Sequence, residues 1–303
     1  MSVEQVIHCA SCGNAEGVQL KECGGCDLVK YCSDACQVEH KPEHEEVCKK
    51  RATELRDELL FKQPESTHMG DCPICMLPLP LDMSKSSMCC SCSKVICRGC
   101  MLANNKRVKE QRLQQSCLFC REPVAKTEEE HFRRNMKRVE VNDPVALCHE
   151  GVAQDKKGDY SKAFEYFAKA AELGDAEAHY KLAGLYLFGN GVEKDREKEI
   201  YHLEEAAISG QPDARYNLGS YESFVGNAAR AVKHWTIAAN LGHDVSIKEL
   251  MRAFRDGECS KDELASALRS HKAAVDAMKS PQREAAAKAW PQREATATLW
   301  RIN

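Results

Sequence analysis

Sixteen cysteines and one histidine, His44, lie within residues 9–121 of this chain at spacings that suit metal ligands. Of its 18 cysteines, all but Cys148 and Cys259 lie at or before Cys120. A tight turn between the cysteines of a CxxC pair directs both sulfurs to one side, where they can bind the same metal ion. The chemistry that this pattern predicts is structural coordination of zinc by thiolates.

Extracellular disulfides are the alternative use of so many cysteines, and they require an oxidising compartment. Residues 1–30 show no signal peptide, because Glu4 and His8 interrupt the apolar residues. No apolar run approaches the ~20 residues that span a bilayer. We therefore expect zinc-bound thiolates in a soluble, intracellular protein of the cytoplasm or nucleus, without membrane contact.

Eight candidate ligands lie within residues 9–48. Two CxxC pairs come first, and two pairs with i, i+4 spacing follow, which places both side chains of a pair on one face of a helix. Because a structural zinc takes four ligands, eight ligands predict two ions. The predicted ligands are Cys9, Cys12, Cys23, Cys26, Cys32, Cys36, His44 and Cys48.

This ordered set, with Tyr31 before Cys32 and Gln37 after Cys36, resembles the MYND zinc finger. MYND fingers commonly bind proline-rich peptides through a Gln and a Trp four residues apart, and here Lys41 stands at the Trp position. Peptide binding through Gln37 and simple packing against neighbouring parts of the chain are both open interpretations. The resemblance implies interleaved sites, with Cys9, Cys12, Cys32 and Cys36 on one zinc and Cys23, Cys26, His44 and Cys48 on the other.

Nine further cysteines lie within residues 72–121, and the run from CPIC through CRGC to CLFCREP resembles a RING finger. RING fingers usually carry a His three or four residues before the fifth ligand, where this chain has Lys94 and Ser93, and Cys92, one place further back, substitutes for it. The resemblance implies that one zinc is bound by Cys72, Cys75, Cys97 and Cys100. It implies that the other is bound by Cys92, Cys117, Cys120 and either Cys89 or Cys90, of which Cys90 enters our predicted ligand set.

In RING-type ubiquitin ligases, a ubiquitin-conjugating enzyme docks on a shallow apolar patch between the two zinc loops. Ile74 matches that patch, as does Leu118, which stands where a Pro is more usual. Arg121 directly follows the last cysteine and matches the basic linchpin, which would act by positioning the charged ubiquitin. The alternative is that Arg121 is an ordinary surface residue and that the module only mediates interactions.

A repeated pattern occupies the second half of the chain. KAAELGDAEAHYKLAGLYLFG recurs as EAAISGQPDARYNLGSYESFVG and, more faintly, as IAANLGHDVSIKELMRAFRDG. Gly174, Gly210 and Gly242 mark the period where a helix end needs positive φ, and Asp175 or Pro212 opens the next helix. Repeats of this length predict a solenoid of helix hairpins. The pattern resembles the Sel-one-like repeat, a relative of the tetratricopeptide repeat, which implies binding of other proteins.

The predicted fold is multi-domain, with two small zinc-stabilised cross-brace modules followed by an all-α helical-hairpin solenoid. The predicted segments are a MYND-type finger at 9–48, a linker at 49–71, a RING-like finger at 72–121, a linker helix at 122–141, Sel-one-like repeats at 142–280 and a loosely ordered tail at 281–303.

Charge and motifs together favour a binding function. The formal net charge is −3, so the chain as a whole has no electrostatic attraction for nucleic acid, and it shows no Gly-rich phosphate loop or nucleophile motif. Our first hypothesis is an interaction scaffold that binds about four zinc ions. The alternatives are a RING-type ubiquitin-protein ligase, with the solenoid as substrate receptor, and a zinc-finger transcriptional regulator.

Overall fold

The computed structural model describes residues 8–13 and 19–290. The chain divides into two compact units, one ending at Lys62 and the other beginning at Gln63, and each is described by itself. The predicted architecture, cysteine-rich modules followed by a helical solenoid, is confirmed.

The first unit contains residues 9–48, called the first module below. Strands β1 (Lys21–Glu22) and β2 (Lys30–Tyr31) pair antiparallel, and helix α1 (Asp34–Leu60) follows. Ser33 caps α1 by accepting a hydrogen bond from the Cys36 amide. Cys32 therefore lies before the helix, and our expectation of one helix face for Cys32 and Cys36 is wrong, whereas His44 and Cys48 do lie on α1. The predicted linker begins as helix, because α1 continues through Leu60.

The second unit opens with residues 72–121, called the second module below. Strands β3 (Ser86–Met88) and β4 (Val95–Cys97) form an antiparallel hairpin, and helix α2 (Arg98–Glu110) leaves directly from β4. A small apolar core of Cys72, Leu79, Ile96 and Cys97 holds these elements together. Helix α3 (Glu128–Glu140), capped by Thr127, corresponds to the predicted linker helix.

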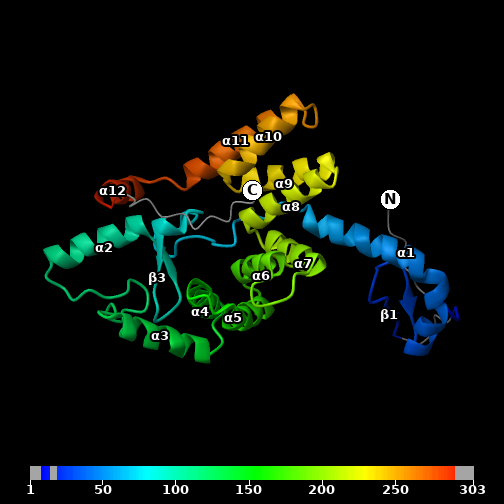
Figure 1. Ribbon diagram of the computed structural model, residues 1–303, viewed down its shortest axis with the longest axis horizontal. Helices are drawn as coiled ribbons and strands as arrows, with labels where there is room; N and C mark the ends of the chain where they lie inside the picture. The colour runs from blue at the N-terminus through cyan, green and yellow to red at the C-terminus, as the bar shows by residue number, and fades with distance from the viewer. Residues whose placement is uncertain (1–7, 14–18, 291–303) are drawn as a thin grey trace. The chain divides into compact units, whose positions relative to one another are not determined.

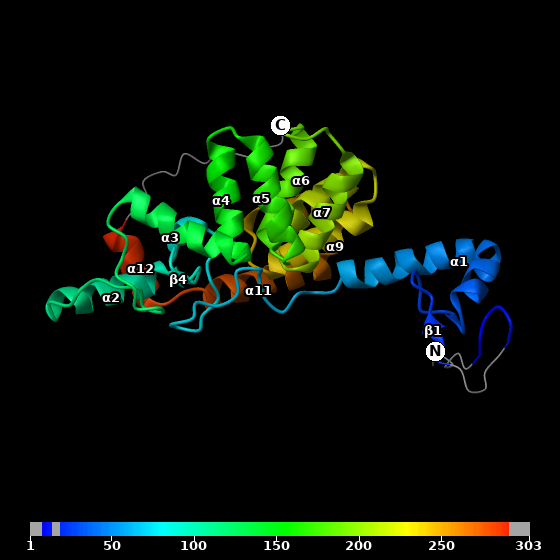
Figure 2. The ribbon, with the colours of Figure 1, turned by 90° about the horizontal axis from the view of Figure 1, so that it is seen from below.

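Eight helices then form four antiparallel hairpins. Figure 2 shows the helices of the first two, labelled α4 to α7, side by side. Gly174, Gly210 and Gly242 have φ of 85°, 84° and 88°, so the predicted left-handed turns at these positions are present. Each turn is followed by a helix start in the predicted place. The helices are α4 (Pro144–Lys156), α5 (Tyr160–Glu172), α6 (Ala176–Phe188), α7 (Arg196–Ile208), α8 (Pro212–Phe224), α9 (Ala228–Asn240), α10 (Asp244–Arg255) and α11 (Lys261–Ala277).

The hairpins pack through matched small and large residues. A Cβ added to Gly151 of α4 would lie 2.6 Å from the Phe167 ring of α5, and one added to Gly219 of α8 would lie 2.5 Å from Nε1 of Trp235 of α9. Phe167 and Trp235 are each 1% exposed. The helices of these hairpins therefore approach as closely as they do only because the residue facing each aromatic ring lacks a side chain.

The segment between Gln63 and Gly70 is not a free linker, because it lies against the repeats. The His68 amide donates to the Gly210 carbonyl at 3.1 Å, and the Asn240 side chain donates to Gln63 Oε1 at 2.9 Å. His68 Nε2 lies 3.6 Å from a Glu177 carboxylate oxygen. A Cβ on Gly210 would lie 2.6 Å from the Ser66 carbonyl oxygen, so this approach also depends on a glycine.

The C-terminal part of the described chain forms helix α12 (Pro281–Ala289), which packs against α2, as Figures 1 and 2 show. The predicted tail after Lys279 is helical over these residues, as the repeated PQREA segment indicates, and only the expectation of loose order is wrong there, since Ala286 is buried and Ser280 caps the helix. Residues 291–303 of that predicted tail lie outside the described residues. Within the described ranges, no helix is both long enough and apolar enough to cross a bilayer.

Candidate metal centres

The structure gathers sixteen ligand side chains into four groups of four. In each group the ligand atoms all lie within 4.8 Å of one another. Four sulfurs about 2.3 Å from one zinc at tetrahedral angles lie about 3.8 Å apart, so groups of this size fit the ion. The groups are Cys9, Cys12, Cys32 and Cys36; Cys23, Cys26, His44 and Cys48; Cys72, Cys75, Cys97 and Cys100; and Cys89, Cys92, Cys117 and Cys120.

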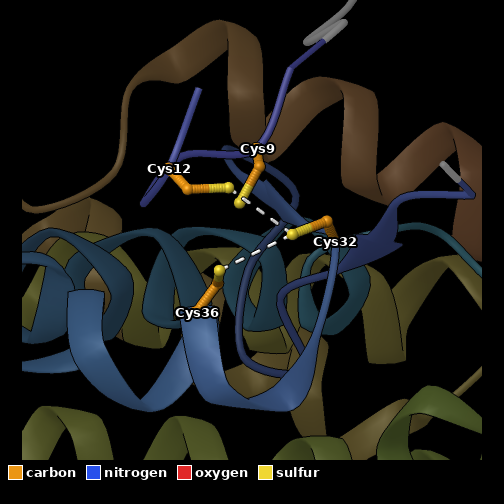
Figure 3. Close-up of side chains that lie close together, drawn as sticks. All are labelled: Cys9, Cys12, Cys32 and Cys36. Carbon is orange, nitrogen blue, oxygen red and sulfur yellow. Dashed lines mark hydrogen bonds between the residues drawn. The ribbon is translucent and has the colours of Figure 1, made fainter. Parts of the chain in front are cut away.

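The two groups of the first module interleave as the resemblance implied. Figure 3 shows the sulfurs of Cys9, Cys12, Cys32 and Cys36 turned towards one another. Cys32 Sγ lies 3.6 Å from Cys12 Sγ and 3.5 Å from Cys36 Sγ. Hydrogen bonds from the backbone amides of Cys12 and Cys32 lower the pKa of the Cys9 thiol to about 6. These hydrogen bonds therefore favour the thiolate of Cys9, which is the form that binds zinc.

The other group of the first module uses a mixed donor set. Cys26 Sγ lies 3.1 Å from His44 Nε2, and Cys23 Sγ lies 3.6 Å from Cys48 Sγ. His44 and Cys48 project from successive turns of α1, while Cys23 and Cys26 flank the turn after β1. Three thiolates and one imidazole are a donor set that structural zinc commonly takes.

The groups of the second module contain only cysteines. The paired sulfurs of Cys72 and Cys100, and of Cys75 and Cys97, are each 3.9 Å apart. Burial would raise the pKa of the Cys72 thiol, but hydrogen bonds from the Cys97 and Cys75 amides outweigh it and lower that pKa to about 7. The Cys97 amide nitrogen lies 3.5 Å from Cys72 Sγ. Backbone donors thus stabilise the negative charge of a buried thiolate.

The fourth group contains Cys89 and not Cys90, which corrects our predicted ligand set. Cys89 and Cys92 have CxxC spacing, whereas Cys90 and Cys92 do not. The Ser93 amide bonds to the Cys89 carbonyl at 2.8 Å, and Ser93 has a φ of 55°. This tight turn directs the Cys89 and Cys92 sulfurs together, so spacing alone would have identified Cys89.

The same turn recurs after three other CxxC pairs. Gly13, Met76 and Arg121 each follow the second cysteine with positive φ, and each amide bonds to the carbonyl of the first cysteine of its pair. Arg121 therefore has a defined backbone role, with φ of 61° and an amide hydrogen bond to the Cys117 carbonyl at 3.1 Å. Its side chain is exposed.

All 18 cysteines lie within the described residues, and every one of them is a free thiol. The sulfurs therefore remain available as ligands. The donor sets and the spacings of the ligand atoms fit zinc at all four groups.

Two of the three residues predicted to contact a conjugating enzyme lie in the same groove. Ile74 and Leu118 line one groove of about 390 Å³ beside the third group, together with Leu77, Ala103 and Arg107. Ile74 is 43% exposed. Arg121 is not among the residues that line this groove.

In the first module, Gln37 and Lys41 lie one turn apart on α1, and Lys41 is exposed. That is the spacing of the Gln and Trp positions of a peptide-binding MYND finger, with a lysine in place of the aromatic ring.

Two kinds of building block define this chain, a zinc finger and a helical-repeat array. The model of the MYND finger matches residues 9–48, and that of the Sel1 repeat matches residues 146–175, 176–211 and 212–243. Sel1 repeats are protein–protein interaction modules, so other proteins are the class of partner that they indicate. The RING-like interpretation of residues 72–121 stays a prediction.

Two curated proteins share parts of the sequence. Chitin synthase regulatory factor 4 of Schizosaccharomyces pombe is 31% identical over 86 residues, which are 28% of this chain and 14% of that protein. The ERAD-associated E3 ubiquitin-protein ligase component HRD3B of Arabidopsis thaliana is 45% identical over 58 residues, which are 19% of this chain and 9% of that protein. The chain therefore matches a small part of each.

Two solved structures have similar repeats. A Sel1 repeat protein from Oxalobacter formigenes has a TM-score of 0.44 and 27% identity, covering 51% of this chain and 66% of that one. The antigen c5321 from uropathogenic Escherichia coli, which has an SLR fold, has a TM-score of 0.39 and 22% identity, covering 59% of this chain and 39% of that one.

Proposed function

We propose that this chain is a zinc-dependent scaffold that binds one protein on its repeats and a second on the second module. The observation that carries the proposal is the groove beside the third metal group, which is lined by Ile74 and Leu118 and lies apart from the repeats. Ile74 lines this groove and is 43% exposed, so a docking partner would remove its apolar side chain from water. The cysteine chemistry supports a cytoplasmic or nuclear location, where thiols stay reduced.

The repeats offer an apolar surface of their own. Phe188 and Phe224 occupy equivalent positions, at the last residue of α6 and of α8, and are 42% and 87% exposed. Large aromatic residues contribute strongly to binding when a partner covers them. In the first module, Gln37 supports capture of a proline-rich peptide, although Lys41 supplies no ring on which a proline could stack.

Two variants test the scaffold. Ile74→Asp places a charge in the groove, and Phe224→Asp places one on the repeats, so each should abolish a different set of interactions. The measurement is quantitative mass spectrometry of proteins cross-linked to the full-length chain in cell extract, with Met83→Asp as the control because Met83 is 58% exposed and outside the groove lining. If both variants lose the same proteins, or neither loses any, two independent docking surfaces do not exist.

A ubiquitin ligase is the second candidate function, and the shared groove of Ile74 and Leu118 specifically favours it. Under this hypothesis, a conjugating enzyme carrying ubiquitin as a thioester docks in the groove, and Arg121 holds the ubiquitin for attack by an amine. The transfer needs no covalent intermediate on this chain, because positioning supplies the rate enhancement.

Discharge of ubiquitin from a panel of charged conjugating enzymes tests the ligase hypothesis. Ile74→Asp and Arg121→Asn are each expected to slow discharge about tenfold or more, whereas Met83→Asp is not. Asn is the better replacement at position 121, because the φ of 61° is one that Asn tolerates and Ala does not. Absence of discharge across the panel by the wild-type, zinc-loaded chain would leave the scaffold as the function.

A further inference from the structure

Helix α12 touches both cysteine pairs of the third metal group, Cys72/Cys75 and Cys97/Cys100. Arg283 contacts the turn after the first pair, and the backbone at Arg283 covers Gly99, which lies within the second pair. These contacts join positions separated by about 200 residues, as in the bond from Arg283 to the Pro78 carbonyl, which spans 205 positions.

One guanidinium makes most of these contacts. Arg283 Nη1 donates to the Pro78 and Met278 carbonyls, both at 2.7 Å. Its Nη2 donates to the Leu77 carbonyl at 3.1 Å and lies 3.5 Å from Cys75 Sγ. A planar fork with several fixed donors suits this set of acceptors, whereas the single ammonium of a lysine does not.

Gly99 provides independent evidence for the same arrangement. A Cβ at this position would lie 2.8 Å from the Arg283 amide nitrogen and 2.9 Å from Arg283 Cγ. Gly99 has no positive φ that would explain the glycine, so the close approach of α12 is its structural reason. Any residue type with a Cβ at position 99 would push the helix away.

We propose that Arg283 is a positioning residue of the zinc site formed by Cys72, Cys75, Cys97 and Cys100. Helix α12 is then structurally part of the second module, because it holds that zinc site in place. A zinc held by four thiolates carries a net negative charge, and a cation that also donates to a ligand sulfur stabilises it. The guanidinium additionally fixes the backbone that presents Cys75. The same helix start supplies Ser280 and Gln282 to the docking groove.

An arginine from outside residues 72–121 also contacts the backbone around the fourth metal group. Arg134 of α3 donates to the Pro123 carbonyl, just beyond the last cysteine pair, and lies 3.4 Å from Ser91 Oγ, between Cys89 and Cys92. Each zinc site of the second module is thus supported by one arginine from outside residues 72–121. This pair of arginines makes the proposal testable one site at a time.

Pulse alkylation of the zinc-loaded, full-length chain with N-ethylmaleimide, read out per cysteine by mass spectrometry, tests the proposal. Loss of an outer-shell partner typically weakens metal binding about 10- to 100-fold. Arg283→Gln is therefore expected to speed modification of Cys72, Cys75, Cys97 and Cys100 about tenfold and to leave the fourth group protected. Arg134→Gln is expected to do the converse.

Three further variants separate positioning from general destabilisation. Gly99→Ala, which displaces α12 without removing the guanidinium, is expected to reproduce the effect of Arg283→Gln, and Arg283→Lys to give an intermediate effect. Lys288→Gln removes a charge from an exposed position of the same helix and should change nothing. Unchanged protection in Arg283→Gln, or equal loss at both groups, would overturn the proposal. It rests on zinc in this module and not on any partner, so failure of the docking experiments would leave it standing.

Discussion

Removal of zinc is expected to unfold both cysteine-rich modules and to leave helices α4–α11 folded. Neither module has a core large enough to fold alone, and a structural zinc site contributes on the order of 10 kcal/mol of folding free energy. The repeats instead have continuous apolar cores, such as the one that contains Leu147, Phe167 and Leu182. Hydrogen exchange before and after chelation, followed by mass spectrometry, measures the effect segment by segment.

The expected zinc content is about four ions per chain, since four ligand groups are assembled. Cys89→Ser is expected to lose about one ion, while Cys90→Ser should keep the full content, because only Cys89 belongs to the fourth group. Elemental analysis of the purified variants gives the counts. A wild-type content near two, or loss of an ion in Cys90→Ser, would contradict the assignment.

Two substitutions that are each damaging, at Gly219 and at Trp235 in the hairpin of α8 and α9, are expected to compensate for one another when they are combined. Gly219→Ala forces a methyl group to within 2.5 Å of Trp235 and should cost about 1–3 kcal/mol. Trp235→Leu leaves a cavity and should cost on the order of 2–4 kcal/mol. The double variant should be less destabilised than the sum by about 1 kcal/mol or more, since the leucine frees the space that the methyl group needs.

The hairpin of α6 and α7 already has the combination of alanine and leucine. Ala183 and Leu203 occupy the positions equivalent to Gly219 and Trp235, and both are buried. Urea unfolding followed by circular dichroism measures the four free energies of the cycle. The reciprocal pair Ala183→Gly with Leu203→Trp is the matched control and should also be tolerated better than Leu203→Trp alone. Additive effects in both hairpins would show that these residues are not coupled.

Several features of the chain could be predicted from short stretches of sequence. The ligands of the CxxC pairs follow from that spacing, because a turn of four residues decides where both sulfurs point, and Cys89 obeys that rule. Helix ends follow from single residues such as Gly174 and Asp175, which act on the backbone next to them. A single residue also explains why the prediction of a shared helix face for Cys32 and Cys36 was wrong, since Ser33 caps α1 and leaves Cys32 outside the helix.

The sequence by itself therefore determined the ligand types, the repeat period and the class of fold, all of which depend on interactions within a few residues or one repeat. Only the tertiary structure decided that Arg283 supports a zinc site, that Gly210 admits the segment at Ser66, and that Gly219 faces Trp235. Those pairs are brought together by the packing of whole helices. An Ala-rich tail or a lone glycine carries no local signal of what will lie against it.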